Sequence, residues 1–108
     1  MTTSPGEIEF WSLAEPLLER PGVSRSTMMG LPCLRVDGAF FASCDRRTGH
    51  LLVKLPQERV EDLVAAGRAE PFAPAGRRFR QWAAIPHAQA PDWPALLDDA
   101  LAFVGGAR

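Results

Sequence analysis

The chain lacks the features that mark membrane proteins and disulfide-stabilised secreted proteins. No apolar run approaches the roughly 18 residues that a membrane-spanning helix needs. Only two cysteines occur among 108 residues, which is too few for a disulfide framework. The first ten residues contain no basic stretch followed by an apolar core, so we expect no signal peptide. These absences predict a cytoplasmic protein with reduced thiols.

The chain also lacks a large net charge. Twelve Lys and Arg residues oppose thirteen Asp and Glu residues, which gives a formal net charge of −1. This excludes a polycation that would bind nucleic acid or membranes through its overall charge. Hydrophobic residues make up 46% of the chain and charged residues 23%, as in ordinary globular proteins. We expect a single domain over residues 1–108.

Catalytic and metal-binding motifs are missing as well. The sequence has no glycine-rich phosphate-binding loop. Cys33 and Cys44 are too far apart for a metal-binding pair, and they are predicted to be small, half-buried thiols on one sheet face. His50 and His87 have no third ligand nearby, so we expect both on the surface. The sequence therefore predicts no catalytic residue, no cofactor and no metal, and a non-enzymatic protein.

The first predicted helix has a clear beginning. Ser4 as N-cap, Pro5 at the first helical position and Glu7 at the third form a capping box. Apolar residues then recur at helical spacing. Pro16 removes one backbone hydrogen bond, so we expect a kink or an early weakening of the helix there, and Pro21-Gly22 closes the helix.

Two further helices are predicted downstream. Pro56 opens the second helix and Gly67 closes it. Asp92 is expected to cap the third helix, which ends at Gly105-Gly106.

The segment between the first two helices has an apolar period of two, which indicates strands. Asp37-Gly38 is a strong hairpin turn. We predict strands at 23–29, 32–37, 39–45, 50–55 and 78–85. Residues 70–76 contain two prolines and are predicted to be a loop or a short edge piece. The order of elements predicts an α+β fold: a two-layer sandwich of an antiparallel β-sheet of about five strands, with three helices packed on one face.

The hairpin register assigns strand residues to the two sheet faces. The Asp37-Gly38 turn pairs Arg35 with Phe40, and a five-residue loop at 45–49 pairs Phe40 with Lys54. The face toward the helices then carries Leu34, Val36, Phe41, Leu51, Val53 and Leu55. The opposite face carries Cys33, Arg35, Phe40, Ala42, Cys44, His50, Leu52 and Lys54.

Charge is segregated along the chain. The predicted helical segments total −7, and the predicted strand and loop segments total +6. A row formed by Arg35, Phe40 and Lys54 across the sheet is the first candidate for binding nucleic acid. Charged heads beside an aromatic ring suit a phosphate backbone and an unstacked base. The alternative is that Arg and Lys stems only cover the open face of the sheet.

Two further basic clusters are candidates for binding an anion or a nucleic acid. One consists of Arg77, Arg78, Arg80 and Trp82. In a strand, Arg78, Arg80 and Trp82 share one face, where guanidinium groups beside an indole suit a phosphate or a base. The alternative is a solvated arginine edge with Trp82 in the core. The other cluster is Arg46 and Arg47 at a hairpin tip. The alternative is that these two arginines are only solvated turn residues.

Most of the chain resembles the MmcQ/YjbR-like family, and more loosely the amino-terminal domain of TfoX-type competence regulators. The resemblance rests on PGVS-x-ST-x-x-G-x-P at Pro21–Pro32, V-x-G-x-x-F-A at Val36–Ala42, and L-x-K-L-P-x-E-R at Leu52–Arg59. Trp82 and the leucine-rich last helix fit the family's closing strand and helix. The TfoX likeness rests on Thr27–Gly30, followed by the hairpin at Asp37.

The resemblance implies an α/β sandwich around an antiparallel sheet and a DNA-binding or transcription-associated role without catalytic residues. The net charge of −1 on this chain departs from what a DNA-binding role would favour. Two other functions remain open. One is a protein-interaction domain that uses an acidic helical surface of Glu7, Glu9, Glu15 and Glu19. The other is a small-ligand-binding domain with a pocket under residues 70–77.

Overall fold

A computed structural model describes residues 4–28 and 30–106 of the chain. The helices are α1 (Pro5–Leu17), α2 (Gln57–Ala65) and α3 (Trp93–Leu101). The strands are β1 (Val23–Met28), β2 (Leu31–Val36), β3 (Ala39–Cys44), β4 (Leu51–Lys54), β5 (Glu70–Phe72) and β6 (Phe79–Ile85). The strand predicted at 23–29 thus ends at Met28, and Met29 lies outside the described residues.

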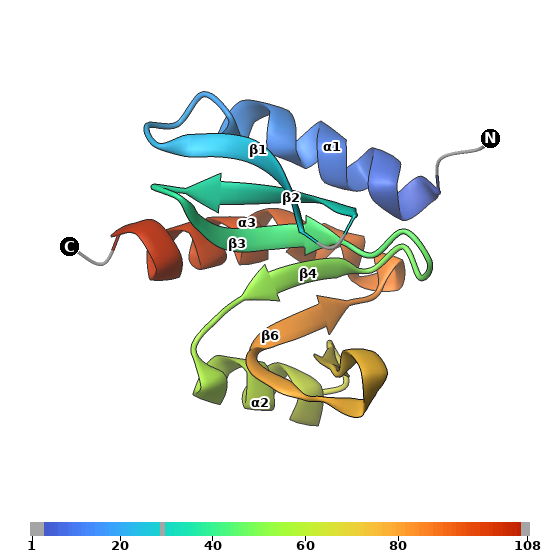
Figure 1. Ribbon diagram of the computed structural model, residues 1–108. Helices are drawn as coiled ribbons and strands as arrows, with labels where there is room; N and C mark the ends of the chain where they lie inside the picture. The colour runs from blue at the N-terminus through green and yellow to red at the C-terminus, as the bar shows by residue number, and fades with distance from the viewer. Residues whose placement is uncertain (1–3, 29, 107–108) are drawn as a thin grey trace.

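The strands form one antiparallel sheet in the order β1-β2-β3-β4-β6-β5. Figure 1 shows α1 and α3 behind this sheet and α2 at its lower end. The predicted α+β sandwich is confirmed. The sheet has six strands where about five were expected, because the proline-containing segment at 70–76 contributes the short edge strand β5.

A single hydrophobic core joins all three helices to one face of the sheet. Phe10 of α1, Val60 of α2 and Trp93 of α3 are fully or almost fully buried in it. Trp93 also donates a hydrogen bond from its indole nitrogen to the carbonyl oxygen of Pro86, at 3.3 Å. Burial of a large aromatic side chain contributes strongly to core stability. Trp93 therefore fixes the start of α3 against the end of β6.

The beginning of α1 follows the sequence prediction, and its end comes earlier than predicted. The hydroxyl of Ser4 accepts a hydrogen bond from the backbone nitrogen of Glu7, at 3.1 Å. The helix ends at Leu17, directly after Pro16, so the weakening expected at Pro16 ends the helix before the predicted stop at Pro21-Gly22.

The ends of the other helices confirm one prediction and correct another. Gly67 adopts a φ of +74° after α2, where a glycine is favoured. Asp92 does not cap α3 with its side chain, because it already has helical backbone angles within the 3-10 turn His87–Asp92. Its carboxylate instead accepts a hydrogen bond from Arg68 at 2.7 Å. Beyond Leu101 the chain coils on as a wider turn over Ala102–Gly106.

A β-bulge in β3 corrects the predicted assignment of residues to faces. Arg35 pairs with Phe40, as predicted, but Leu34 pairs with Ala42, so Phe41 is an extra residue. Ala42 and Cys44 therefore belong to the core on the helix side, whereas the sequence predicted them on the opposite face.

Candidate nucleic-acid interface

The sheet face turned away from the helices is called the open face below. Its residues alternate along each strand with residues of the helix-side core, so their side chains point the other way. Its members are Cys33, Arg35, Phe40, Ser43, Leu52, Lys54, Arg80, Trp82 and Ala84. The small or apolar side chains at its centre, such as Cys33, Ser43 and Leu52, are fully buried. The accessible groups are therefore the cations and aromatic rings around that centre.

Arg35 and Phe40 form the first cation–aromatic pair of the open face. The guanidinium carbon of Arg35 lies 4.3 Å from the centre of the Phe40 ring. The Nε atom of Arg35 is buried and has no hydrogen-bond partner among the described residues. No described carboxylate forms an ion pair with this guanidinium, so its charge is uncompensated.

Lys54 and Trp82 are a second cation and ring on neighbouring strands of the open face. They are register partners on β4 and β6, and both side chains are half-buried. Arg80 is exposed and shares the face of Trp82 two residues away.

The predicted pairing of Phe40 with Lys54 is wrong. Cys44 pairs with Leu51 rather than with His50, so the connection between β3 and β4 is one residue longer than expected. Phe40 and Lys54 are therefore out of register, and the predicted row is two separate pairs that share one face.

An aromatic cluster adjoins Trp82 at the edge of the sheet. The ring of Phe72 on β5 lies 5.8 Å from that of Phe79 and 6.5 Å from that of Trp82. Arg77 lies over Phe79, which is 38% exposed. The sequence prediction missed Phe72 and Phe79 as members of this aromatic cluster. The position of Phe79 between Arg78 and Arg80 in the sequence could have indicated that its ring lies near these cations.

Arg77 and Arg78 precede β6 instead of lying within it. The strand begins at Phe79, so the predicted shared strand face of Arg78, Arg80 and Trp82 holds for Arg80 and Trp82 alone. Arg77 and Arg78 are both exposed, and neither forms an ion pair with a described residue. They remain available for an anion next to the aromatic cluster.

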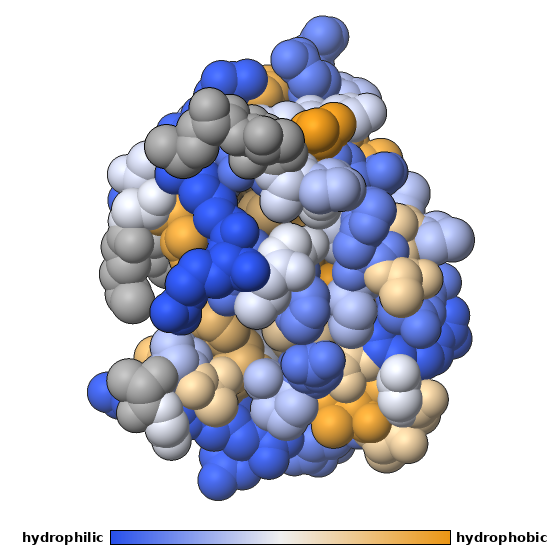
Figure 2. All heavy atoms as spheres, turned by 90° about the vertical axis from the view of Figure 1, so that its right-hand side faces the viewer, coloured by the Kyte–Doolittle hydropathy of each residue, from blue (hydrophilic) through white to orange (hydrophobic). Residues whose placement is uncertain are grey.

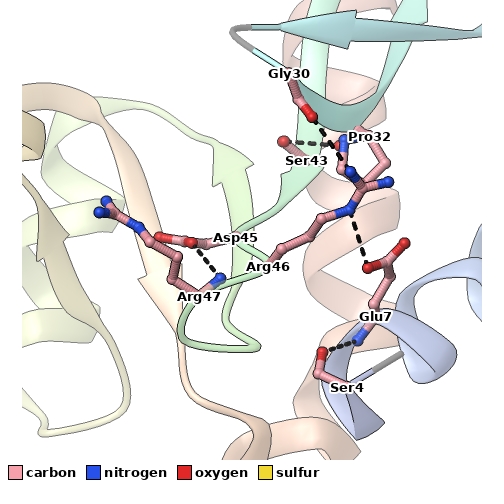
Figure 3. Close-up of polar contacts among 8 residues, drawn as sticks. All are labelled: Ser4, Glu7, Gly30, Pro32, Ser43, Asp45, Arg46 and Arg47. Atoms are coloured by element: carbon pink, nitrogen blue, oxygen red, sulfur yellow. Dashed lines mark hydrogen bonds and ion pairs between the residues drawn. The ribbon is translucent and has the colours of Figure 1, made fainter. Parts of the chain in front are cut away.

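Arg46 and Arg47 leave the turn between β3 and β4 in opposite directions (Figure 3). Arg46 contacts Glu7 of α1 at 3.1 Å and the carbonyl oxygen of Gly30 at 3.4 Å. The Arg47 backbone nitrogen donates to Asp45, and its exposed side chain has no ion-pair partner among the described residues. The structure thus engages Arg46 in the fold and leaves Arg47 accessible.

The ion pair with Arg46 also removes Glu7 from the predicted acidic surface of α1. Its side chain is 13% exposed, because it is turned toward Arg46. Glu15 and Glu19 are exposed and form no ion pair among the described residues. The acidic surface of α1 is therefore smaller than the sequence predicted.

The two thiols lie on opposite faces of the sheet, and both are buried and free. Burial, together with the carboxylates of Glu7 and Asp45, raises the pKa of the Cys44 thiol to about 12, although the charge of Arg46 opposes this. Burial also raises the pKa of Cys33, although a hydrogen bond with Ser26 and the charge of Arg35 oppose this. Neither thiol has the exposed, electropositive surroundings of a reactive cysteine.

Comparisons with family models, with curated proteins and with solved structures found no match to this chain. Within the described residues, no three His, Cys, Asp or Glu side chains gather as a metal site would require. The described helices are also too short or too polar to cross a membrane.

Proposed function

We propose that the open face binds nucleic acid without catalysing a reaction. The observation that carries the proposal is the juxtaposition of cations that have no carboxylate partner with aromatic rings on a sheet face that no described helix covers. Arg35 lies on Phe40, and Lys54 and Arg80 flank Trp82. Phosphates bind such cations, and bases stack on such rings.

The arrangement of ion pairs supports this assignment of charge. The arginines of the helix layer have carboxylate partners: Arg20 with Asp98, Arg59 with Asp99, and Arg68 with Asp92. The cations of the open face have none among the described residues. A chain of net charge −1 can therefore present a locally basic surface to a polyanion.

The resemblance to the MmcQ/YjbR-like family also supports the proposal. Members of that family are described as DNA-binding proteins, and Lys54 and Trp82 match positions of the family. The two positions lie on the same sheet face. The proposed role is that of an accessory DNA-binding or transcription-associated protein.

Salt-dependent binding tests the proposal. Fluorescence anisotropy would compare labelled duplex and single-stranded DNA at low and physiological salt. We expect the double variant K54Q/R80Q to lose about two of the phosphate contacts that set the slope of log affinity against log salt. The control R59Q/R68Q changes the net charge by the same amount on the helix layer and should keep the slope. Equal slopes for both variants, or no binding at low salt, would refute the proposal.

Lys54 offers a direct footprint, because it is the one lysine in the chain. DNA bound on the open face should slow acetylation of the Lys54 amine by a soluble reagent. The α-amino group of the chain serves as the internal control. Equal acetylation rates with and without DNA at saturation would place the nucleic acid elsewhere.

A second candidate function is protein binding through α1. Ile8 is 58% exposed and lies two turns from Glu15 on the same face of α1, and Glu19 follows shortly after the end of the helix. An exposed isoleucine beside unpaired carboxylates suits a basic protein surface with an apolar centre. Loss of a captured partner on E15Q/E19Q, with K54Q/R80Q retaining it, would favour this function.

A further inference from the structure

A cavity of about 410 Å³ lies between α1 and the edge strand β1, on the other side of the molecule from the edge strand β5. It is lined by Trp11, Arg25, Ser26, Thr27, Pro32 and Arg46. It is separate from the segment 70–77 that the sequence suggested for a ligand. Figure 2 shows the side of the molecule that carries the start of α1 and the turn between β3 and β4, where hydrophilic side chains surround hollowed apolar patches.

Both guanidinium groups of the cavity are held in place by neighbours. The guanidinium carbon of Arg25 lies 4.6 Å from the centre of the Trp11 ring. Arg46 is fixed through Nε by Glu7 and through Nη1 by the carbonyl oxygen of Gly30 (Figure 3). Arg25 has no ion-pair partner among the described residues. Preorganised charges lower the entropy lost when a ligand binds.

The lining offers several kinds of donor to one ligand. Arg25 and Arg46 supply planar arrays of N–H groups, and Thr27 supplies a hydroxyl. The three terminal oxygens of a phosphomonoester can accept from both guanidiniums and a hydroxyl at once, whereas a carboxylate has two oxygens. Trp11 and Pro32 add apolar surface beside these donors.

We propose that this cavity binds a small phosphomonoester that carries a planar group. The phosphate lies between Arg25 and Arg46, and the planar group lies against Trp11 and Pro32. The size of the cavity is that of a small-molecule site. This site is independent of the open face, since none of its lining residues belongs to the cation–aromatic pairs proposed to bind nucleic acid.

Titration with phenyl phosphate, followed by NMR of the backbone and indole N–H signals, tests the proposal. We expect saturable shifts at Trp11 and Arg25, with Trp82 and Trp93 unaffected. Phenol and benzoate, which keep the ring without the phosphate, should bind at least about ten-fold more weakly, because they make fewer charge-assisted hydrogen bonds. Inorganic phosphate should shift Arg25 more weakly than phenyl phosphate does.

Variants separate this site from the open face. R25Q should weaken phenyl phosphate binding about ten-fold. The matched controls are R59Q, which removes an arginine of the helix layer, and K54Q/R80Q, which removes open-face cations; both should bind normally. T27A removes one hydroxyl of the exposed strand edge and should weaken binding less than R25Q, so it gives a second test if R25Q does not fold. Equal binding by R25Q and R59Q, unshifted Trp11 signals, unchanged binding by T27A, or benzoate binding as tightly as phenyl phosphate would overturn the proposal.

Discussion

The Nε atom of Arg46 lies 3.1 Å from Oε1 of Glu7, although the two residues are 39 positions apart in the chain. The contact joins the turn between β3 and β4 to the first turn of α1. The same guanidinium reaches Gly30 in the turn between β1 and β2. One side chain therefore links three segments that the sheet hydrogen bonds do not connect directly.

The first prediction concerns the strength of this contact. A double-mutant cycle with E7Q and R46Q should give a coupling free energy of unfolding of about 1 kcal/mol, at the upper end for surface pairs. The carboxylate is largely buried, but the guanidinium is 56% exposed, which limits the gain. Urea unfolding of the four proteins measures the coupling, and the value should fall as salt rises. The Arg59–Asp99 pair, with both side chains exposed, is the control and should give less. Equal coupling in both pairs contradicts the prediction.

The second prediction concerns the close approach of Gly6 to Gly49. A Cβ atom on Gly6 would overlap the carbonyl oxygen of Gly49, and Gly6 is buried. G6A should therefore lower the free energy of unfolding by about 2 kcal/mol, although alanine is intrinsically the better helix former by roughly 1 kcal/mol. Urea unfolding measures the change, with S12A on the exposed side of α1 as control. A more stable G6A protein would show that the helix can move away from the turn without cost.

The third prediction concerns alkaline pH. In the folded protein, burial raises the pKa of Cys44 to about 12 from an ordinary value of 9.0. The unfolded chain then loses the thiol proton first, so stability should fall as pH rises above 9.0 toward 12, by as much as about 1.4 kcal/mol per pH unit for one thiol. The chain has no tyrosine and one lysine, so few other side chains titrate there. Urea unfolding from pH 8 to pH 10 measures the slope, and C44A should reduce it.

A thiol-labelling experiment checks the same burial by another route. Both cysteines should react with a soluble aromatic disulfide far more slowly in the native protein than in urea. Rapid native labelling of Cys44 would contradict the assignment, whatever the alkaline stability shows.

Local signals in the sequence predicted the helix starts and hairpins that depend on neighbouring residues. Ser4 caps α1 because an N-cap bond spans three residues. Asp37 and Gly38 form the tight turn because both adopt positive φ angles, which their residue types favour. The cap predicted at Asp92 failed, because the backbone before α3 was already coiled and the carboxylate had a distant partner in Arg68. Sequence spacing holds no information about that partner.

The candidate site was predicted only where its geometry depends on residues that are close in the sequence. The pairing of Arg35 with Phe40 follows from the two-residue turn, and it is confirmed. The pairing of Phe40 with Lys54 required a five-residue connection between β3 and β4, and that connection is one residue longer. The contacts of Arg46 with Glu7 and of Arg25 with Trp11 join distant segments through side chains. Periodicity has no means of predicting these contacts.

The bulge at Phe41 changes which side of the sheet the later residues of β3 face. With strict alternation, Ser43 would point into the helix-side core and Cys44 would point out of it. The extra residue reverses both, so the Ser43 hydroxyl stays out of the apolar layer and donates to the carbonyl oxygen of Pro32, at 2.8 Å. Together with the longer connection between β3 and β4, it keeps Arg35 and Lys54 on the same side of the sheet. One inserted residue in the middle strand thus decides which chemical groups this protein shows to its surroundings.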